Sequence, residues 1–322
     1  MRYAGMQLLL SDIQTDPSVA QAVPAMTADG RCVRCGQNLT IKLPIGLRYC
    51  PVCVNLGRVV EGQSLYRFDA PKFPPTSSLT WTGELTPAQQ VASDQLLKSV
   101  QVRREHLLWA VTGAGKTEML FPAIASVLDA GGRVGVAAPR IDVVRELAPR
   151  LAQAFAHTSI GVRFGGAPWP KHDVALTVLT THQLLRYYHC FDLLVIDEVD
   201  AFPFAHDEAL MYAAKHAVKG SLVWLSATPS KKFITTRSRW QNRVKHLAET
   251  LSWSAFASTQ AGLGEKSQVA KTITDSVVDA VKISGHHASG LVICAGYRLV
   301  GADHQCVAST IKGRNSKCPR PR

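Results

Sequence analysis

The feature that most restricts the fold of this chain is a glycine-rich turn between an apolar run and a helical stretch, in HLLWAVTGAGKTEML at residues 106–120. Such a turn at the start of a helix presents backbone N–H groups and the positive end of the helix dipole to phosphate groups. We expect Lys116 to reach the β- and γ-phosphates of a nucleotide and the Thr117 hydroxyl to ligate Mg2+. The alternative is a chance glycine turn, since Ala110 stands where the usual pattern has its first glycine. The predicted cradle comprises Gly113, Ala114, Gly115, Lys116 and Thr117.

The sequence around this turn alternates between short apolar runs and helical stretches. Residues 117–129 and 141–156 are the helical stretches, and both lie between runs of buried-strand length. This alternation predicts an α/β fold in which a parallel sheet is covered on both faces. The predicted strands are HLLWAV, RVGVAA, VALTVLT, FDLLVID and SLVWLS.

Two carboxylates follow one of these predicted strands, in FDLLVIDEVD. They lie at the carboxyl end of the strand, where open parallel sheets bind their ligands. Asp197 is suited to holding Mg2+, and Glu198 is suited to orienting or deprotonating a water that attacks the γ-phosphate. We therefore predict Lys116, Asp197 and Glu198 as the catalytic residues. A carboxylate-rich loop after a core strand is the alternative.

Four of the eight cysteines form two C-x-x-C pairs, CVRCG and CPVC. Two such knuckles supply four thiolates in a tetrahedron, which suits Zn2+, and the intervening QNLTIKLPIGLRY resembles a short hairpin. A zinc ribbon of this size has little core, so the metal would supply most of its folding energy. A redox dithiol is the competing interpretation. The predicted metal ligands are Cys32, Cys35, Cys50 and Cys53.

The predicted ribbon can serve either as a structural staple or as a nucleic-acid contact. Its candidate phosphate contacts are Arg31, Arg34, Lys42 and Arg48. FDAPKFPPTSS, which follows the ribbon, is rich in Pro and Ser and is typical of a linker. We predict an N-terminal arm over 1–28, the ribbon over 29–62, the linker over 63–79, the nucleotide lobe over 80–232 and a basic tail over 233–322.

The motifs together resemble the first RecA-like lobe of a superfamily 2 helicase, a P-loop NTPase fold. G-x-G-K-T, D-E-x-D and S-A-T follow one another in the expected order. The resemblance implies that Gln89 of LTPAQQ reads adenine and that Trp81 stacks on the base. It assigns Asp200, Ser226 and Thr228 to coupling. It also places APRIDVVREL and TTHQLLR on the DNA side, which makes Arg140, Thr181, His182 and Gln183 the candidate DNA contacts.

A narrower resemblance is to the late-competence DNA-uptake helicases, the ComFA family. It is carried by the four-cysteine ribbon ahead of the lobe together with WAVTGAGKTEML and IDEVDAFPF, and it covers residues 32–232. It implies a cytoplasmic, ATP-driven protein that pulls single-stranded DNA through a membrane channel. The implied partners are single-stranded DNA and other competence proteins, and the implied cofactors are ATP, Mg2+ and Zn2+.

The tail differs from the rest of the chain in charge and in motifs. Residues 233–322 carry 13 Lys and Arg against 5 Asp and Glu, a large share of the net charge of +12. They contain no threonine-rich motif ending in Arg-Gly and no Q-x-x-G-R-x-G-R, which the second lobe of such motors supplies. We expect a poorly structured tail, and a divergent accessory domain is the alternative.

A shifted reading frame explains this tail. With synonymous codons chosen freely, AETLSWSAFASTQAGLGEK can be reread to include H-G-R-P-L-P-V-P, similar to a segment that the family has after S-A-T-P. GLVICAGYRLVGAD can be reread to include W-S-F-V-P-A-I-D-W-L-A-R, which resembles the opening of a second lobe. The Lys231–Lys232 pair is a plausible slippage point. We therefore expect ATP binding without DNA unwinding from this chain.

Two functions fit the sequence. One is an ATP-dependent DNA helicase or translocase of the DNA-uptake type, and the other is an ATP- and zinc-binding module without motor activity. No apolar run approaches a membrane span, and the N-terminus lacks a small-residue cleavage site, so we expect a cytoplasmic protein that associates at most with a membrane channel.

Overall fold

The structure is a computed structural model that describes residues 2–111, 113–169 and 171–229. The tail predicted for residues 233–322, its shifted-frame origin and its folding state lie outside these residues. Within the described part of the chain, no helix has both the length and the apolar character that crossing a membrane requires.

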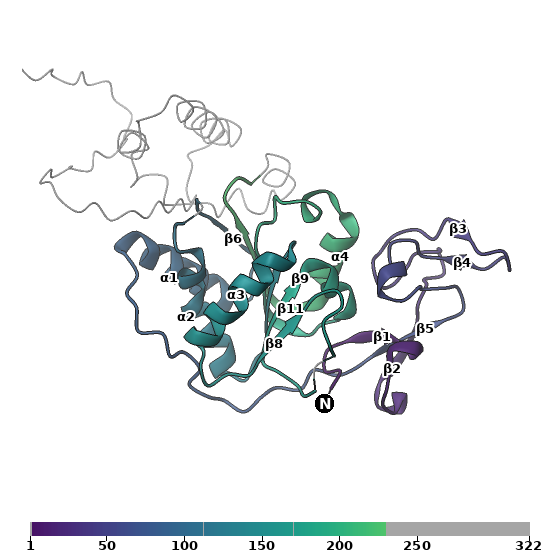
Figure 1. Cartoon of the computed structure of the whole chain (residues 1–322), viewed down its shortest axis with the longest axis horizontal. Helices are drawn as coiled ribbons and strands as arrows, with labels where there is room; N and C mark the ends of the chain where they lie inside the picture. The colour runs from purple at the N-terminus through teal and green to yellow at the C-terminus, as the bar shows by residue number, and fades with distance from the viewer. Residues whose placement is uncertain (1, 112, 170, 230–322) are drawn as a thin grey trace, which may run out of the picture.

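The predicted parallel sheet is confirmed, and it has six strands in the order β6-β11-β10-β7-β9-β8 (Figure 1). All five of its strand pairings are parallel. β7 and β9 are buried along their whole length, as strands covered on both faces must be. The edge strand β8 was not anticipated. The strands are β6 (His106–Trp109), β7 (Val134–Ala138), β8 (Ile160–Arg163), β9 (Leu176–Thr180), β10 (Phe191–Ile196) and β11 (Val218–Ser226).

Helices cover both faces of this sheet. α1, α2 and α3 lie together on one side in Figure 1, and their buried residues form one apolar cluster with Val134, Val136 and Val195. α4 lies on the other side, in a second cluster with Leu222 and Trp224. The α-helices are α1 (Pro87–Gln101), α2 (Lys116–Asp129), α3 (Ile141–Ala154) and α4 (Glu208–Ala217). The 3-10 helices are η1 (Leu10–Asp12), η2 (Pro17–Val19), η3 (Val54–Leu56), η4 (Thr181–Arg186) and η5 (Phe204–His206).

The N-terminal part of the chain forms two small sheets of its own. The hairpin expected between the cysteine pairs is present, as β3 (Ile41–Lys42) antiparallel to β4 (Arg48–Tyr49). A second sheet, with the order β1-β5-β2, joins the segments expected to be an arm and a linker. Its strands are β1 (Gln7–Leu9), β2 (Gln21–Pro24) and β5 (Ser64–Arg67).

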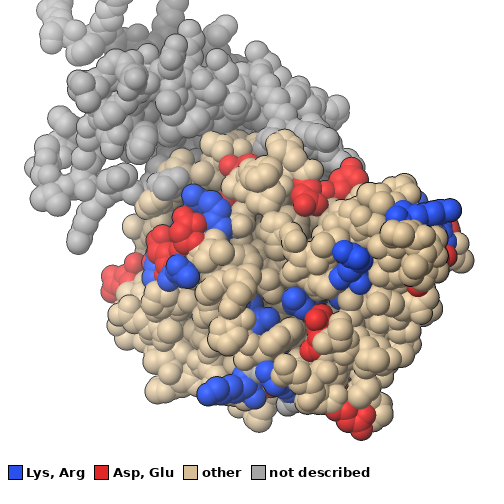
Figure 2. Space-filling view, turned by 45° about the vertical axis from the view of Figure 1, so that its right-hand side comes forward, with Lys and Arg blue, Asp and Glu red and all other residues tan. Residues whose placement is uncertain are grey.

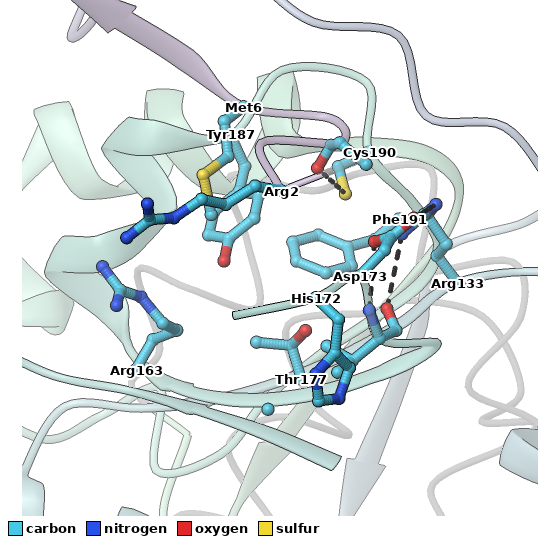
Figure 3. Close-up of a pocket in the computed structure, with 13 residues that line it drawn as sticks. Arg2, Met6, Arg133, Arg163, His172, Asp173, Thr177, Tyr187, Cys190 and Phe191 are labelled. Atoms are coloured by element: carbon cyan, nitrogen blue, oxygen red, sulfur yellow. Dashed lines mark hydrogen bonds and ion pairs between the residues drawn. The ribbon is translucent and has the colours of Figure 1, made fainter. Parts of the chain in front are cut away.

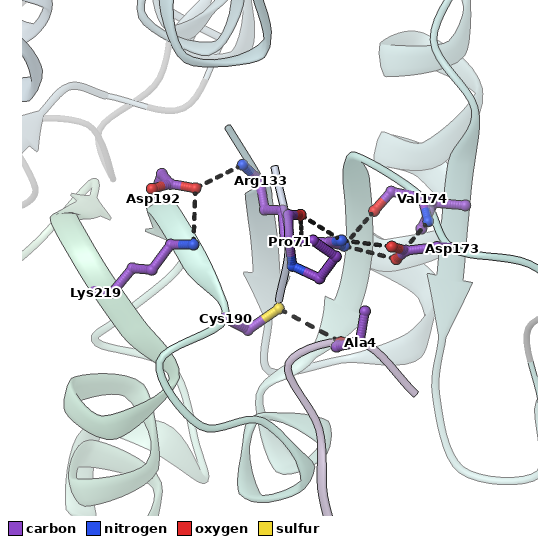
Figure 4. A network of polar contacts seen from close by, with 8 residues as sticks. All are labelled: Ala4, Pro71, Arg133, Asp173, Val174, Cys190, Asp192 and Lys219. Carbon is purple, nitrogen blue, oxygen red and sulfur yellow. Dashed lines mark hydrogen bonds and ion pairs between the residues drawn. The ribbon is translucent and has the colours of Figure 1, made fainter. Parts of the chain in front are cut away.

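The segment after β5 runs along the surface of the lobe. The Arg133 guanidinium donates to the Pro71 carbonyl (Figure 4). It also stacks 4.5 Å from the centre of the Phe73 ring, and the Phe73 N–H donates to the Gly131 carbonyl at 2.8 Å. Gly131 has a φ of 72°, and a Cβ there would stand 2.0 Å from the Phe73 carbonyl oxygen. Only glycine fits this close approach of two backbones.

Candidate nucleotide site and metal centre

The predicted cradle is a turn between β6 and α2. Gly113 and Gly115 take φ values of 80° and 73°, in the left-handed region that favours glycine. The Lys116 Nζ donates to the Ala110 carbonyl at 3.1 Å, so the lysine folds back over the loop. Thr117 is buried in the first turn of α2. The loop therefore has the backbone form that a phosphate requires at the N-terminus of a helix.

Gln89 contacts the same loop from α1. Its Nε2 donates to the Ala114 carbonyl at 2.9 Å, while its Oε1 accepts from the Thr86 N–H at 2.8 Å. Thr86 and Gln89 form the capping box of α1, which fixes the glutamine side chain. Trp81 packs edge-on against Phe121, with ring centres 5.3 Å apart. Stacking of Trp81 on a base stays a prediction.

Asp197 directly follows β10 and lies near Lys116 of the cradle. Its backbone N–H donates to the Ala137 carbonyl at 2.7 Å, and its side chain accepts from the Glu198 N–H at 2.9 Å. Burial raises the pKa of Asp197 above its ordinary value, and the nearby Lys116 cation acts in the opposite direction. A buried carboxylate whose ionised form is disfavoured gains from an added cation, which fits a Mg2+ ligand.

Glu198 is held by an ion pair that the sequence did not indicate. Its φ of 49° is uncommon for a residue with a side chain, and strained backbone of this kind often occurs at functional sites. The Arg140 Nη2 lies 3.2 Å and 3.3 Å from the two Glu198 carboxylate oxygens. The predicted catalytic carboxylate therefore contacts a residue predicted to bind DNA.

The three residues assigned to coupling lie in direct contact. Asp200 accepts from the Ser226 hydroxyl through one oxygen and from the Thr228 hydroxyl through the other, each at 2.7 Å. These bonds tie the loop that carries Asp197 and Glu198 to the end of β11.

The four cysteines form one buried cluster. All four Sγ atoms lie within 4.8 Å of one another, with Cys32 and Cys53 3.8 Å apart and Cys35 and Cys50 3.4 Å apart. Tetrahedral Zn2+ with Zn–S bonds of about 2.3 Å needs sulfur atoms about 3.8 Å apart. None of the four is in a disulfide, so the donor set and its spacing fit zinc.

Comparison with known proteins agrees with this geometry. Residues 86–236 match the DEAD/DEAH box helicase family. The chain is 42% identical over 227 residues to the competence protein ComFA of Streptococcus pneumoniae, a match that covers 68% of this chain and 52% of that protein. It is 45% identical over 212 residues to ComFA of Bacillus subtilis, covering 63% and 46%. The chain is a ComFA homologue with a DEAD/DEAH box helicase domain.

This ComFA homologue spans about half the length of the curated relatives that it matches. It is also similar to the crystal structure of a hypothetical ATP-dependent RNA helicase from Sulfolobus tokodaii. That likeness has 19% sequence identity and a TM-score of 0.40, and covers 48% of this chain and 50% of the other.

The residues predicted to touch DNA do not share one environment in this ComFA homologue. Thr181 and Gln183 are buried, while His182 is exposed. Arg140 is exposed but is paired with Glu198. His182 and Arg140 are therefore the members of this set that a strand can reach in the described conformation.

The basic residues of the ribbon lie in different environments. Arg34 is fully buried and donates to the carbonyls of Leu56 and Gly57, so it is not available as a phosphate contact. Arg48 pairs with Glu61, Arg31 pairs with an aspartate, and Lys42 is exposed. On the face drawn in Figure 2, basic side chains are scattered among acidic and uncharged ones.

The contact between the ribbon and the lobe was not predicted from the sequence. A Cβ at Gly36 would stand 2.5 Å from the Tyr212 ring of α4, and the Tyr212 hydroxyl donates to the Val33 carbonyl at 3.4 Å. Both Val33 and Gly36 flank cysteines of the four-cysteine cluster. Residues of the first cysteine knuckle thus contact the helix that covers one face of the lobe.

Proposed function

We propose that this chain carries the ATP-hydrolysing lobe of a competence DNA helicase, which couples hydrolysis of Mg2+–ATP to movement of single-stranded DNA. The observation that carries the proposal is the convergence of Lys116, Asp197 and Glu198 at the carboxyl end of the sheet. Further support comes from the match to the DEAD/DEAH box helicases and from the ComFA relatives.

Each residue of the site has a defined task in this proposal. Lys116 would exchange the Ala110 carbonyl for phosphate oxygens when nucleotide binds, and Thr117 and Asp197 would hold Mg2+, which supplies positive charge against the phosphates. Glu198 takes the proton of the attacking water. Gln89 already contacts the loop and is suited to reporting an occupied adenine site to it.

The Arg140–Glu198 ion pair gives DNA binding a way to affect ATP hydrolysis. Both carboxylate oxygens of Glu198 face the Arg140 guanidinium, which competes with an attacking water for them. A DNA phosphate that competes for the exposed Arg140 would release Glu198 toward the water. We propose that this exchange makes hydrolysis respond to DNA.

The metal centre and the partners complete the proposal. Zn2+ held by Cys32, Cys35, Cys50 and Cys53 stabilises the ribbon, and single-stranded DNA and other competence proteins are the partners. The protein works in the cytoplasm at a membrane channel. These assignments rest on the fit of the cysteine cluster and on the ComFA relatives.

A second candidate is an ATP- and zinc-binding module without motor activity. It is favoured by the missing second-lobe motifs after residue 232, where a shifted frame is predicted. Sequencing the gene across the codons for Lys231 and Lys232 tests that frame. A continuous helicase lobe in another frame is the expected result, and its absence would contradict the shifted frame.

Steady-state ATP turnover by the full chain, with and without single-stranded oligonucleotide, tests the proposal. We expect hydrolysis that DNA stimulates and that Glu198→Gln abolishes, while the exposed Glu208→Gln on α4 leaves it unchanged. Turnover that never exceeds the Glu198→Gln background would contradict a motor and favour the second candidate.

A further inference from the structure

A second hollow in the lobe lies far from the nucleotide site. It is formed between the N-terminal segment and strands β8 and β9, and its lining includes Arg2, Arg163, Thr177 and Tyr187 (Figure 3). β8 is one edge strand of the sheet, whereas β6, which leads into the phosphate loop, is the opposite edge. A ligand of this pocket would therefore not occupy the nucleotide site.

Arg163, the last residue of β8, is a buried cation without a carboxylate partner among the described residues. Its exposed fraction is 4%. Its Nη1 donates to the Pro168 carbonyl at 2.6 Å, and its Nε is buried with no hydrogen-bond acceptor in the described part of the chain. Burial lowers the pKa of Arg163 below its ordinary value. A buried charge left in this condition costs free energy unless an opposite charge approaches it.

Neighbouring side chains add to the positive charge. Arg163 and Arg186 both stack near the Trp169 ring, with guanidinium carbons 4.6 Å and 5.0 Å from its centre. Arg2 also lines the pocket, and its Nε is likewise buried with no acceptor among the described residues. Arginines on the N-terminal segment and on the lobe thus converge on one hollow.

The carboxylates near these arginines already have partners. Asp173 lines the pocket but pairs with Arg133, on the opposite side of the pocket from Arg2 and Arg163 (Figures 3 and 4). Asp12 pairs with Arg186 at 3.3 Å. Neither supplies the counter-charge that Arg163 lacks, so the pocket keeps an excess of positive charge.

We propose that this pocket binds a phosphate-class oxyanion, which Arg163 holds with the help of Arg2. A phosphate group presents several acceptor oxygens, and charge-assisted bonds from guanidinium groups are the strong form of such contacts. The ligand can be free phosphate or a phosphate of a nucleic-acid strand. The site would also join the N-terminal segment to the lobe, because one arginine comes from each.

Thermal unfolding of the full chain in Lys116→Ala form, which removes the cation of the phosphate loop, tests the proposal. Inorganic phosphate is titrated against chloride at matched ionic strength. We expect phosphate to raise the unfolding temperature, and Arg163→Met to weaken the apparent phosphate affinity about tenfold or more. Arg104→Met, which replaces an exposed arginine, should leave that affinity unchanged.

A second variant and a second ligand let the test decide even if Arg163→Met does not fold. Arg2→Met should weaken phosphate binding even if Arg163→Met does not fold. A single-stranded oligonucleotide that reproduces the Arg163-dependent shift identifies a strand phosphate, whereas a shift with phosphate alone identifies a free anion. The proposal is overturned if phosphate does not stabilise the Lys116→Ala chain. It is also overturned if the stabilisation is equal in Arg163→Met and Arg104→Met. Where Arg163→Met does not fold, equal stabilisation in Arg2→Met and Arg104→Met overturns it.

Discussion

The nucleotide lobe and the cysteine ribbon lie in contact, yet different forces hold them together. The lobe buries whole strands such as β7 and β9 between two layers of helices. The ribbon has two strands of two residues each, and its most buried side chains include the four cysteines. Apolar burial therefore specifies the lobe, whereas a ribbon this small would depend on the proposed Zn2+ for most of its stability.

Removal of the metal should show the difference in stability between the two regions most clearly. Zinc binding in small ribbons contributes ~10–16 kcal/mol of folding free energy, so Cys35→Ser or strong chelation should unfold the ribbon and leave the lobe folded. Metal analysis should find one Zn2+ per chain, and limited proteolysis should cut the ribbon only after chelation. Cys190→Ala, in the lobe, should keep full zinc content. Less than half an equivalent of zinc in carefully purified protein would contradict the assignment.

A cavity in the lobe should destabilise the lobe and leave the ribbon with its zinc. Leu194 on β10 is fully buried, and Leu194→Ala should lower the free energy of unfolding of the lobe by ~2–5 kcal/mol. Denaturant unfolding followed by tryptophan fluorescence measures this loss, and Val91→Ala on the exposed side of α1 is the control. Zinc content should not change. Loss of zinc in Leu194→Ala would show that the ribbon depends on the lobe for its fold.

The ion pair at the site should matter least for stability. Arg140 and Glu198 are both partly exposed, and exposed pairs contribute ~0.2–1 kcal/mol. Arg140→Ala should therefore leave the unfolding midpoint nearly unchanged while it weakens the response of ATP turnover to DNA. Arg145→Ala, on the helix α3 that begins directly after Arg140, is the matched control. DNA stimulation that persists unchanged in Arg140→Ala would remove Arg140 from the coupling route.

The sequence predicted those parts of the molecule that local pattern determines. Apolar runs of strand length and the C-x-x-C spacing are local signals, so five strands of the lobe and the β3–β4 hairpin were predicted. β8 was missed because its four residues, IGVR, end in a charge and include only one buried residue. β2 was missed because it is largely exposed and pairs with β5, which lies far along the chain.

Polar contacts between residues far apart in the chain could not be predicted from the sequence pattern. Arg140 and Glu198 come from different loops, and nothing local indicates that they pair. The resemblance to superfamily 2 helicases made Thr181 and Gln183 candidate DNA contacts, and both side chains are buried in η4. A motif match does not show which way a side chain faces.

The central claim is that Lys116, Asp197 and Glu198 form an ATP site in the lobe. Calorimetric titration of Mg2+–ATP into the full chain tests it most directly, with Lys116→Ala, Glu198→Gln and the exposed Lys98→Ala as variants. We predict that Lys116→Ala loses about tenfold to a hundredfold in affinity, because it removes a charge-assisted contact to phosphate. Glu198→Gln and Lys98→Ala should bind as the unaltered chain does. Equal affinity in Lys116→Ala and the unaltered chain would contradict the account.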